Sequence, residues 1–592
     1  MRISGRTRGS ARMPVLGSLA LLGLALTAAA QQAPPSNDPL FRAMRDEIER
    51  SRKLAIPNLE SPYYIEYGID EQETFSAAAS LGGLISRRRE RFRTPFISVR
   101  VGDYKFDNTN FGRGGGGGSR YDLGQFPVED SYPVLRRYLW LYTDSAYKGA
   151  VEALSRKRAA LRNISQDDML DDFSHAEPLH FIRDFKPLVV DENSWVDRVR
   201  SLARIFERFP EIQDSSVDLE VTEGGHYMEN SEGTEIRTPE SVTMMRARAA
   251  AQAPDGSTVR DFAFFHALNP GGMPGEADMT REVTAMARNL AALAHAPKGE
   301  DYNGPVLFEG VAGAQLFAEV LGENLSLMRR PDVGRGPAGP PGDLEGRMGA
   351  RVLPESFDVV DDPSLKDYQG HVLFGSYEVD REGVPAKRLQ MVEKGVLKNF
   401  LLTRQPMKGF EGSNGRARYP AEGGICLAGI SNLIVTSSET MPAADMKKKL
   451  IEMLQARSKP YGLIVRKLDF PSTASFDEAG RIATAQQGTA HPISIPLLVY
   501  KVYADGHEEL VRGLQFHAFN TRSLRDIVAA GDDHNALDFM DSTAPFDLVG
   551  LAGFTMEASV VAPSVLIDDL ELHPVEGEQP KLPLVPAPEI TH

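Results

Sequence analysis

Residues 304–317 restrict the fold of this chain more than any other segment, because an apolar strand there runs directly into a helix-like stretch. The segment reads GPVLFEGVAGAQLF, with Glu309 at the junction and no histidine. An apolar stripe at helical spacing leads up to it and predicts a helix packed on the core: Met279, Val283, Met286, Leu290 and Leu293. We therefore expect a core-facing helix, a strand and a second helix in close succession.

Hydrophobic periodicity along the rest of the chain predicts an α+β fold. Helical spacing recurs in four further stretches: 40–48, 133–163, 443–454 and, more weakly, 524–530. Strand and hairpin signals mark the others: 63–67, 96–101, 217–267 around the turn 230–233, 389–402 around 393–395, and 497–513 around Asp505-Gly506. We expect an N-terminal α/β domain with antiparallel strands and helices at 38–300, and a mostly antiparallel β domain at 301–573.

Four stretches have the composition of signals, loops or tails. Residues 1–30 carry a basic start, an apolar run and small residues, which is typical of a secretory signal peptide. Pro and Gly crowd 329–349, which predicts a flexible loop, and the glycine-rich run 112–118 predicts another. The Pro-rich end, 574–592, predicts a disordered tail.

The charge balance argues against nucleic acid as a partner. The 592-residue chain has a formal net charge of −16, and the predicted signal holds four arginines and no acid, so the remainder carries −16 − 4 = −20. Such a surface repels phosphate backbones. The signal predicts a periplasmic or secreted bacterial protein with no stable membrane span after cleavage. An uncleaved membrane anchor is the alternative.

The motifs of hydrolytic enzymes are missing or incomplete. His507 and Glu508 begin like a zinc-binding helix, but they follow a hairpin turn and predict a strand edge. Cys426, the single cysteine, is expected to be a buried small side chain rather than a nucleophile. The acidic group Asp532-Asp533-His534 is expected to be a solvated loop, with a cation site as the alternative. The twelve histidines are scattered, none three or four residues from another, so the sequence predicts no metal ligands and no cofactor.

Several short sequence motifs resemble those of the TldD/PmbA family, the so-called modulators of DNA gyrase. They share their order and spacing with that family: residues 230–233 (NSEG), 361–365 (DDPSL), 380–386 (DREGVPA), 393–398 (EKGVLK), 413–418 (SNGRAR), 431–433 (SNL) and 562–567 (APSVLI). The resemblance covers roughly residues 38–573 and implies a TldD/PmbA-like fold in both domains.

The resemblance also implies where a zinc site would lie. The active member of the family is a zinc peptidase with a His-Glu-x-x-x-His motif at a strand-to-helix junction, and it pairs with a sister subunit that lacks the ligands. On this chain the motif falls on 308–313, where Glu309 is kept and Phe308 and Gly313 replace the histidines. Phenyl and glycine side chains offer no donor to zinc. Glu309, the single catalytic candidate, is therefore expected to cap the following helix instead.

The function that this resemblance implies is a non-catalytic one. We expect an exported, metal-free family member that binds peptides or unfolded segments, pairs as a homodimer or heterodimer with a TldD/PmbA-family subunit, and supports a peptidase partner. Two alternatives stay open: an active peptidase with an unrecognised site, and a binding or structural protein of the cell envelope.

Overall fold

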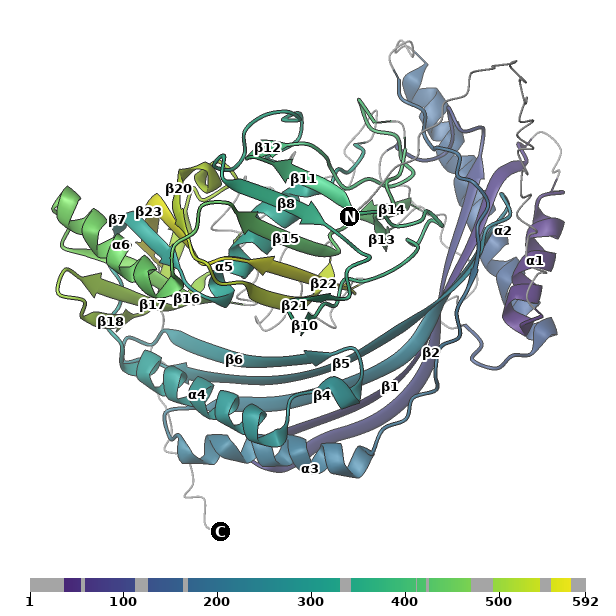
Figure 1. Ribbon diagram of the computed structural model, residues 1–592. Helices are drawn as coiled ribbons and strands as arrows, with labels where there is room; N and C mark the ends of the chain where they lie inside the picture. Colours follow the sequence, from purple (N-terminus) through teal and green to yellow (C-terminus); the bar gives the residue numbers. More distant parts are fainter. Residues whose placement is uncertain are drawn as a thin grey trace, which may run out of the picture. The chain divides into compact units, whose positions relative to one another are not determined.

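The first half of the chain builds one large curved sheet (Figure 1). The structure, a computed structural model, describes residues 37–54, 59–111, 126–162, 169–330, 342–410, 412–421, 425–469, 493–542 and 555–575. The sheet runs in the order β2-β1-β4-β5-β3, with β6 also paired to β5. Its strands are β1 Pro62–Ser80, β2 Gly83–Val101, β3 His180–Ile182, β4 Asp214–Asn230, β5 Glu235–Gln252 and β6 Thr258–Ala267. All pairings are antiparallel except that of β3 with β5.

These strands are far longer than the alternation in the sequence indicates. Most side chains in the first half of β2, residues 83–92, are exposed, so this charged segment shows no apolar alternation. Backbone pairing with β1 and cross-strand ion pairs hold it instead, Arg89 with Glu73 and Arg91 with Glu71. The predicted α+β class is confirmed, with longer antiparallel strands in the first half than the sequence indicates.

Four helices pack on this sheet; the apolar patterns predict three of them, and the helix at 192–203 is not expected from the sequence. They are α1 Pro39–Ser51, α2 Tyr132–Leu161, α3 Glu192–Ala203 and α4 Glu276–His295. The five stripe residues of α4 are all buried, in one core with side chains of α3, β4 and β5. Helices α1 and α2 pack against each other and against β1 and β2. Among the described residues, no helix combines the length and apolar character needed to cross a membrane.

Two further large sheets form the second half. One has the order β18-β17-β16-β7-β23-β19, with β20 on β23. Its strands are β7 Tyr302–Phe308, β16 Tyr461–Leu468, β17 Pro496–Tyr503, β18 Glu508–Val511, β19 Leu514–His517, β20 Ile527–Ala530 and β23 Val565–Pro574. The other has the order β12-β11-β8-β15-β22-β21. Its strands are β8 Phe357–Asp361, β11 Leu389–Glu393, β12 Val396–Leu397, β15 Asn432–Ser437, β21 Asn535–Ser542 and β22 Thr555–Ala562. Two small hairpins complete this half: β9 Asp367–Tyr368 with β10 His371–Val372, and β13 Ala417–Ala421 with β14 Ile425–Ala428.

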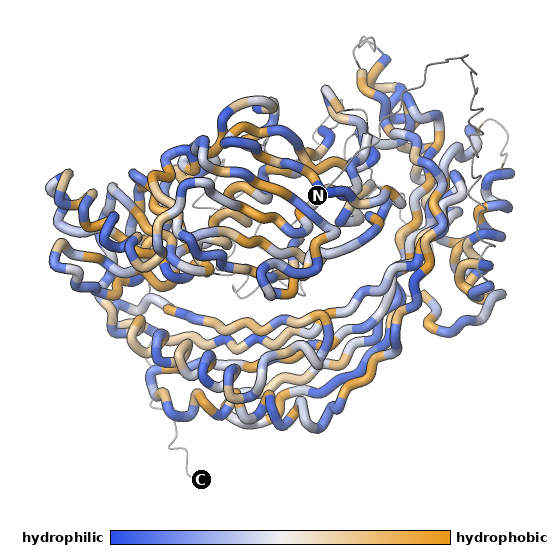
Figure 2. The backbone as a smooth tube through the Cα atoms, in the orientation of Figure 1, coloured by the Kyte–Doolittle hydropathy of each residue, from blue (hydrophilic) through white to orange (hydrophobic). Residues whose placement is uncertain are grey.

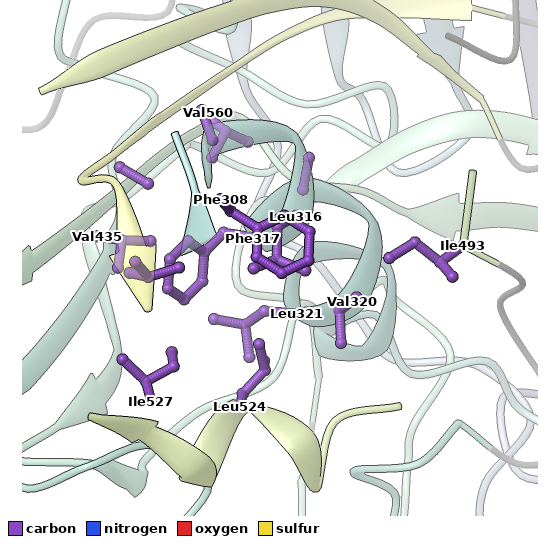
Figure 3. Close-up of a cluster of buried hydrophobic side chains, with 14 of the residues drawn as sticks. Phe308, Leu316, Phe317, Val320, Leu321, Val435, Ile493, Leu524, Ile527 and Val560 are labelled. Atoms are coloured by element: carbon purple, nitrogen blue, oxygen red, sulfur yellow. The ribbon is translucent and has the colours of Figure 1, made fainter. Parts of the chain in front are cut away.

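A short helix, α5 Val311–Leu316, lies in the core between these two sheets and continues as a π-helical turn, Phe317–Gly322. Figure 3 shows its side chains, Leu316 to Leu321, among those of β15, β20 and β22. Figure 2 shows the strands around it rich in hydrophobic residues. Helix α6 Ala443–Arg457 packs on β7, β16, β20 and β23 and completes a smaller core there.

The hairpins predicted at 393–395 and 505–506 are confirmed, as β11–β12 and β17–β18. The helix expected at 524–530 is wrong: a 3₁₀ turn, Ser523–Asp526, leads into strand β20. The apolar run there is too short to distinguish a strand from a helix. The predicted signal 1–30, the run 112–118, the loop residues 331–341 and the tail from 576 onward lie outside the described residues. The division into 38–300 and 301–573 stays a prediction.

Candidate functional site at the strand–helix junction

The strand–helix junction lies at the centre of the β7-containing sheet. β7 pairs in parallel with β16 and antiparallel with β23, so both of its edges are covered. Gly310 follows it with φ 67°, a left-handed backbone conformation that favours glycine. Helix α5 then begins at Val311. The predicted order of strand, glutamate and helix is confirmed.

Phe308, at the first of the two substituted positions, belongs to the hydrophobic core. Its side chain is fully buried and stacks on Phe516 and Phe519, with ring centroids 5.8 and 6.1 Å away. Figure 3 shows it beside Leu316 and Phe317. A phenyl ring in this environment stabilises the core by burial and stacking and offers no metal donor.

Gly313, at the second substituted position, has no space for a side chain. A Cβ placed there would lie 2.6 Å from the carbonyl oxygen of Pro563 and 3.4 Å from the Cα of Ser564. The obstruction is backbone, which moves less readily than a side chain. A ligand residue at position 313 therefore requires a different approach of the β22–β23 connection.

Glu309 does not cap helix α5, so that expectation is wrong. Its carboxylate forms an ion pair with Arg466 of β16, and Arg466 also donates to Glu508 over 2.8 and 3.1 Å. Lys447 of α6 completes the group with a 2.7 Å bond to Glu508. These two carboxylates and two cations neutralise one another at a half-exposed surface.

The start of α5 is held by a different set of groups. The Gly310 amide donates to Ser564 Oγ over 2.9 Å, and Ser564 Oγ donates to Asp533 over 2.6 Å. The neighbouring carboxylate of Asp532 accepts from the Ala443 amide at the start of α6. The acidic group 532–534 is a loop in which Asp532 and His534 are exposed, as predicted, and Asp532 and Asp533 also hold the starts of α6 and α5.

The residues at the junction do not fit a zinc ion. Zinc requires three or four nitrogen, sulfur or oxygen donors at about 2.0–2.3 Å. Of the three motif positions, 308 supplies a phenyl ring, 313 supplies no side chain, and the Glu309 carboxylate is occupied by a guanidinium. The three motif positions therefore supply too few donors for zinc.

Cys426 lies on β14 and is buried, as predicted. Burial, followed by the charges of Glu382 and Glu66, raises the pKa of its thiol well above the ordinary value. Nucleophilic cysteines need the opposite shift, toward the thiolate. Its environment therefore supports a packing role.

A buried ionic network joins the first sheet to the segment after β10, and sequence reasoning missed it. Arg381 donates to both carboxylate oxygens of Asp70 over 2.7 Å and to Glu240 over 3.1 Å. His226 Nδ1 lies 2.7 Å from the same Asp70. The register pairs Asp70 of β1 with His226 of β4, and Glu240 lies on β5, the next strand of the sheet. Arg381 lies in the sequence motif 380–386, but its partners are more than a hundred residues away along the chain.

Burial dominates the protonation behaviour of this network. It raises the pKa of Glu240 to about 8, with the Asp70 charge adding to the effect. The pKa of Glu382 also rises to about 8, because of burial and then the charge of Asp380. Burial and the nearby Arg381 lower the pKa of His226, which keeps that ring neutral. The arrangement is that of a structural contact whose carboxyl groups are partly held as acids.

Comparison with known proteins matches this fold to one class, the proteins related to PmbA and TldD. Residues 301–469 match the family model of the PmbA/TldA metallopeptidase C-terminal domain. In overall fold, the chain is similar to a putative modulator of a DNA gyrase from Thermotoga maritima, with a TM-score of 0.53 and 15% identity. It is equally similar to TldE from Thermococcus kodakarensis, with a TM-score of 0.53 and 13% identity. Each match covers 90% of this chain and 99% of the other.

Two curated metalloproteases share short stretches with the chain. One, from Archaeoglobus fulgidus, is 41% identical over 75 residues, which is 13% of this chain and 16% of the relative. The other, from Methanothermobacter thermautotrophicus, is 39% identical over 62 residues, 10% of this chain and 12% of the relative. The chain thus aligns with less than a fifth of either relative's length. The TldD/PmbA resemblance predicted from the sequence is confirmed: residues 301–469 match a PmbA/TldA metallopeptidase domain, and the fold is similar to that of the solved relatives.

Proposed function

We propose that this chain is a non-catalytic member of a TldD/PmbA-type assembly, which binds peptide or unfolded segments and supports a partner subunit that carries the zinc. The observation behind the proposal is the closed junction. Phe308 is part of the core there, and the carbonyl oxygen of Pro563 occupies the space that a side chain at position 313 would need. We further propose that the chain is exported to the periplasm and pairs with a sister chain as a dimer.

Co-purification from the native cell envelope tests the pairing. A tagged full-length chain is expected to recover a sister chain with an intact His-Glu-x-x-x-His motif. Recovery of self-associated chain alone would contradict the heterodimer.

Cleavage of an unstructured peptide then tests whether the sister chain supplies the catalysis and this chain supports it. The sister chain is expected to cleave only in the presence of this chain, and the purified chain alone is expected to be inactive. Cleavage by the chain alone, lost on chelation, would replace the proposal with an active peptidase. Peptide capture without cleavage by any partner would replace it with an envelope-binding protein.

Glu309→Gln and Glu508→Gln form a matched pair that tests the role of the retained glutamate. Both variants remove one carboxylate from Arg466. If Glu309 is structural, both variants are expected to leave the activity of the reconstituted pair within about twofold of wild type. A selective loss of activity in Glu309→Gln would show that this carboxylate takes part in the reaction.

A further inference from the structure

A group of histidine and carboxylate side chains lies on the outer face of the sheet that contains β7. His517 ends β19, and Glu571 and His573 lie two residues apart near the end of β23. The strands are paired with His517 directly opposite Glu571. One ligand atom from each of these side chains lies within 4.8 Å of the other two. The pairing of two strands, and not sequence spacing, creates the group.

The strand alternation explains why these side chains face solvent together. Phe516 and Leu572 point into the core, so their neighbours at 517, 571 and 573 point to the opposite face. Side chains paired directly across an antiparallel ladder have Cβ atoms about 4.5–5.5 Å apart. That spacing allows both imidazoles to reach the carboxylate between them.

The distances are close to those of a metal centre. His517 Nδ1 lies 3.2 Å from one Glu571 oxygen, and His573 Nε2 lies 2.9 Å from the other. Donors bound tetrahedrally at about 2.0–2.1 Å from zinc are about 3.3 Å from one another. Small rotations of the exposed side chains would therefore direct all three donors at a single ion.

Asp301 supplies a second contact that points to a metal. Asp301 directly precedes β7, and β7 pairs with β23 on the edge opposite β19. Its carboxylate lies 2.8 Å from His573 Nδ1. A carboxylate that accepts from Nδ1–H fixes the tautomer in which Nε2 carries a lone pair. His573 Nε2 lies 2.9 Å from Glu571, so the ring lies between two carboxylates, and a metal ion would take the place of the proton that bridges Nε2 and Glu571.

We infer that His517, Glu571 and His573 form a site for a divalent transition-metal ion, with Asp301 orienting His573. Two imidazoles and one carboxylate suit zinc, nickel or cobalt better than magnesium or calcium. His517 and Glu571 are substantially exposed and His573 is about one-third exposed, so water completes the coordination and the ion exchanges with solvent.

The site would act as a clamp on an edge strand. Among the described residues, β19 is the last strand of its sheet and pairs with β23 alone. Its core-facing Phe516 stacks on Phe308. A metal shared by β19 and β23 would hold that edge in register. This role is separate from the junction and independent of the proposed function.

Titration of the full chain with Zn²⁺ and with Ni²⁺, followed by calorimetry and elemental analysis, tests the site. We expect one ion per wild-type chain, and Co²⁺ should give the visible spectrum of a nitrogen- and oxygen-ligated centre. The double variant His517→Ala/His573→Ala should lose that ion. Asp301→Asn should keep the stoichiometry and weaken binding about tenfold or more. His295→Ala, which removes an exposed histidine outside the group, should bind like wild type.

The outcomes separate the two proposals. Absence of saturable binding in the wild type, or full retention of the ion in the double variant, would overturn the inference. An ion retained in the double variant would have to bind elsewhere, for example at the junction, and this result would also count against the proposed function. Loss of the ion in the double variant supports the clamp and leaves the metal-free junction untouched.

Discussion

Gly313→Ala is the substitution that tests most directly whether the junction is closed to a ligand side chain. Gly313 lies in helix α5, and in a helix interior alanine is ordinarily better than glycine by about 0.8–1 kcal/mol. From local propensity alone, the variant should be more stable than wild type. The tertiary structure predicts the opposite sign.

The magnitude follows from the contact that the new methyl group would make. Its 2.6 Å distance to the Pro563 oxygen is about 0.8 Å shorter than the 3.4 Å at which ordinary contact begins. The connection between β22 and β23, which contains Pro563, cannot move away freely. Ser564 donates two hydrogen bonds to Asp533, and the Ser564 carbonyl accepts from the Gly531 amide over 2.8 Å. Overpacking of a rigid site costs about 1–3 kcal/mol. After the propensity gain is subtracted, we expect a net loss of up to about 2 kcal/mol and no gain.

Gly149→Ala is the matched control. Gly149 lies in helix α2, and a Cβ there would meet no atom within 4 Å, so this variant should gain about 0.8–1 kcal/mol. Urea unfolding of the three proteins, followed by circular dichroism, measures both changes. If Gly313→Ala is stabilised as much as Gly149→Ala, position 313 has room for a side chain and the argument for a closed junction fails.

Three further predictions concern buried groups. Arg381→Met leaves Asp70 buried without its cation and should cost about 3–5 kcal/mol in urea unfolding; a loss below about 1 kcal/mol would mean that the pair behaves like a surface one. Phe308→Ala should cost about 3–5 kcal/mol by the same measurement, whereas Phe92→Ala, 40% exposed on β2, should cost far less; equal losses would contradict the core role of Phe308. Burial raises the pKa of Glu229 from 4.5 to about 8, so the unfolded chain releases this proton at lower pH than the folded chain does, and stability should fall as pH rises through that window. Glu229→Gln should flatten the fall in a series of thermal melts between about pH 5 and 8, and an unchanged slope would show that another group causes it.

Local patterns were sufficient to predict many elements. The apolar stripe of α4, the hairpin turn at Asp505-Gly506 and the strand–helix order around Glu309 depend on neighbours a few residues apart, and the structure has each of them. Strand β2 could not be predicted at its full length, because its exposed charged residues follow no apolar period. Strand β20 lies where the sequence predicts a helix, because its short apolar run becomes a strand only by pairing with β23.

The candidate site shows the same division. The sequence alone determined that positions 308 and 313 carry no metal donor, since that follows from the chemistry of phenylalanine and glycine. Only the tertiary structure decided that Glu309 pairs with Arg466, that Asp533 supports the start of α5 through Ser564, and that Pro563 closes the space at position 313. It also brought His517 to Glu571 and Arg381 to Asp70. The physical reason is that strand pairing and burial join residues separated by tens to hundreds of positions, and such contacts leave no periodic trace along the chain.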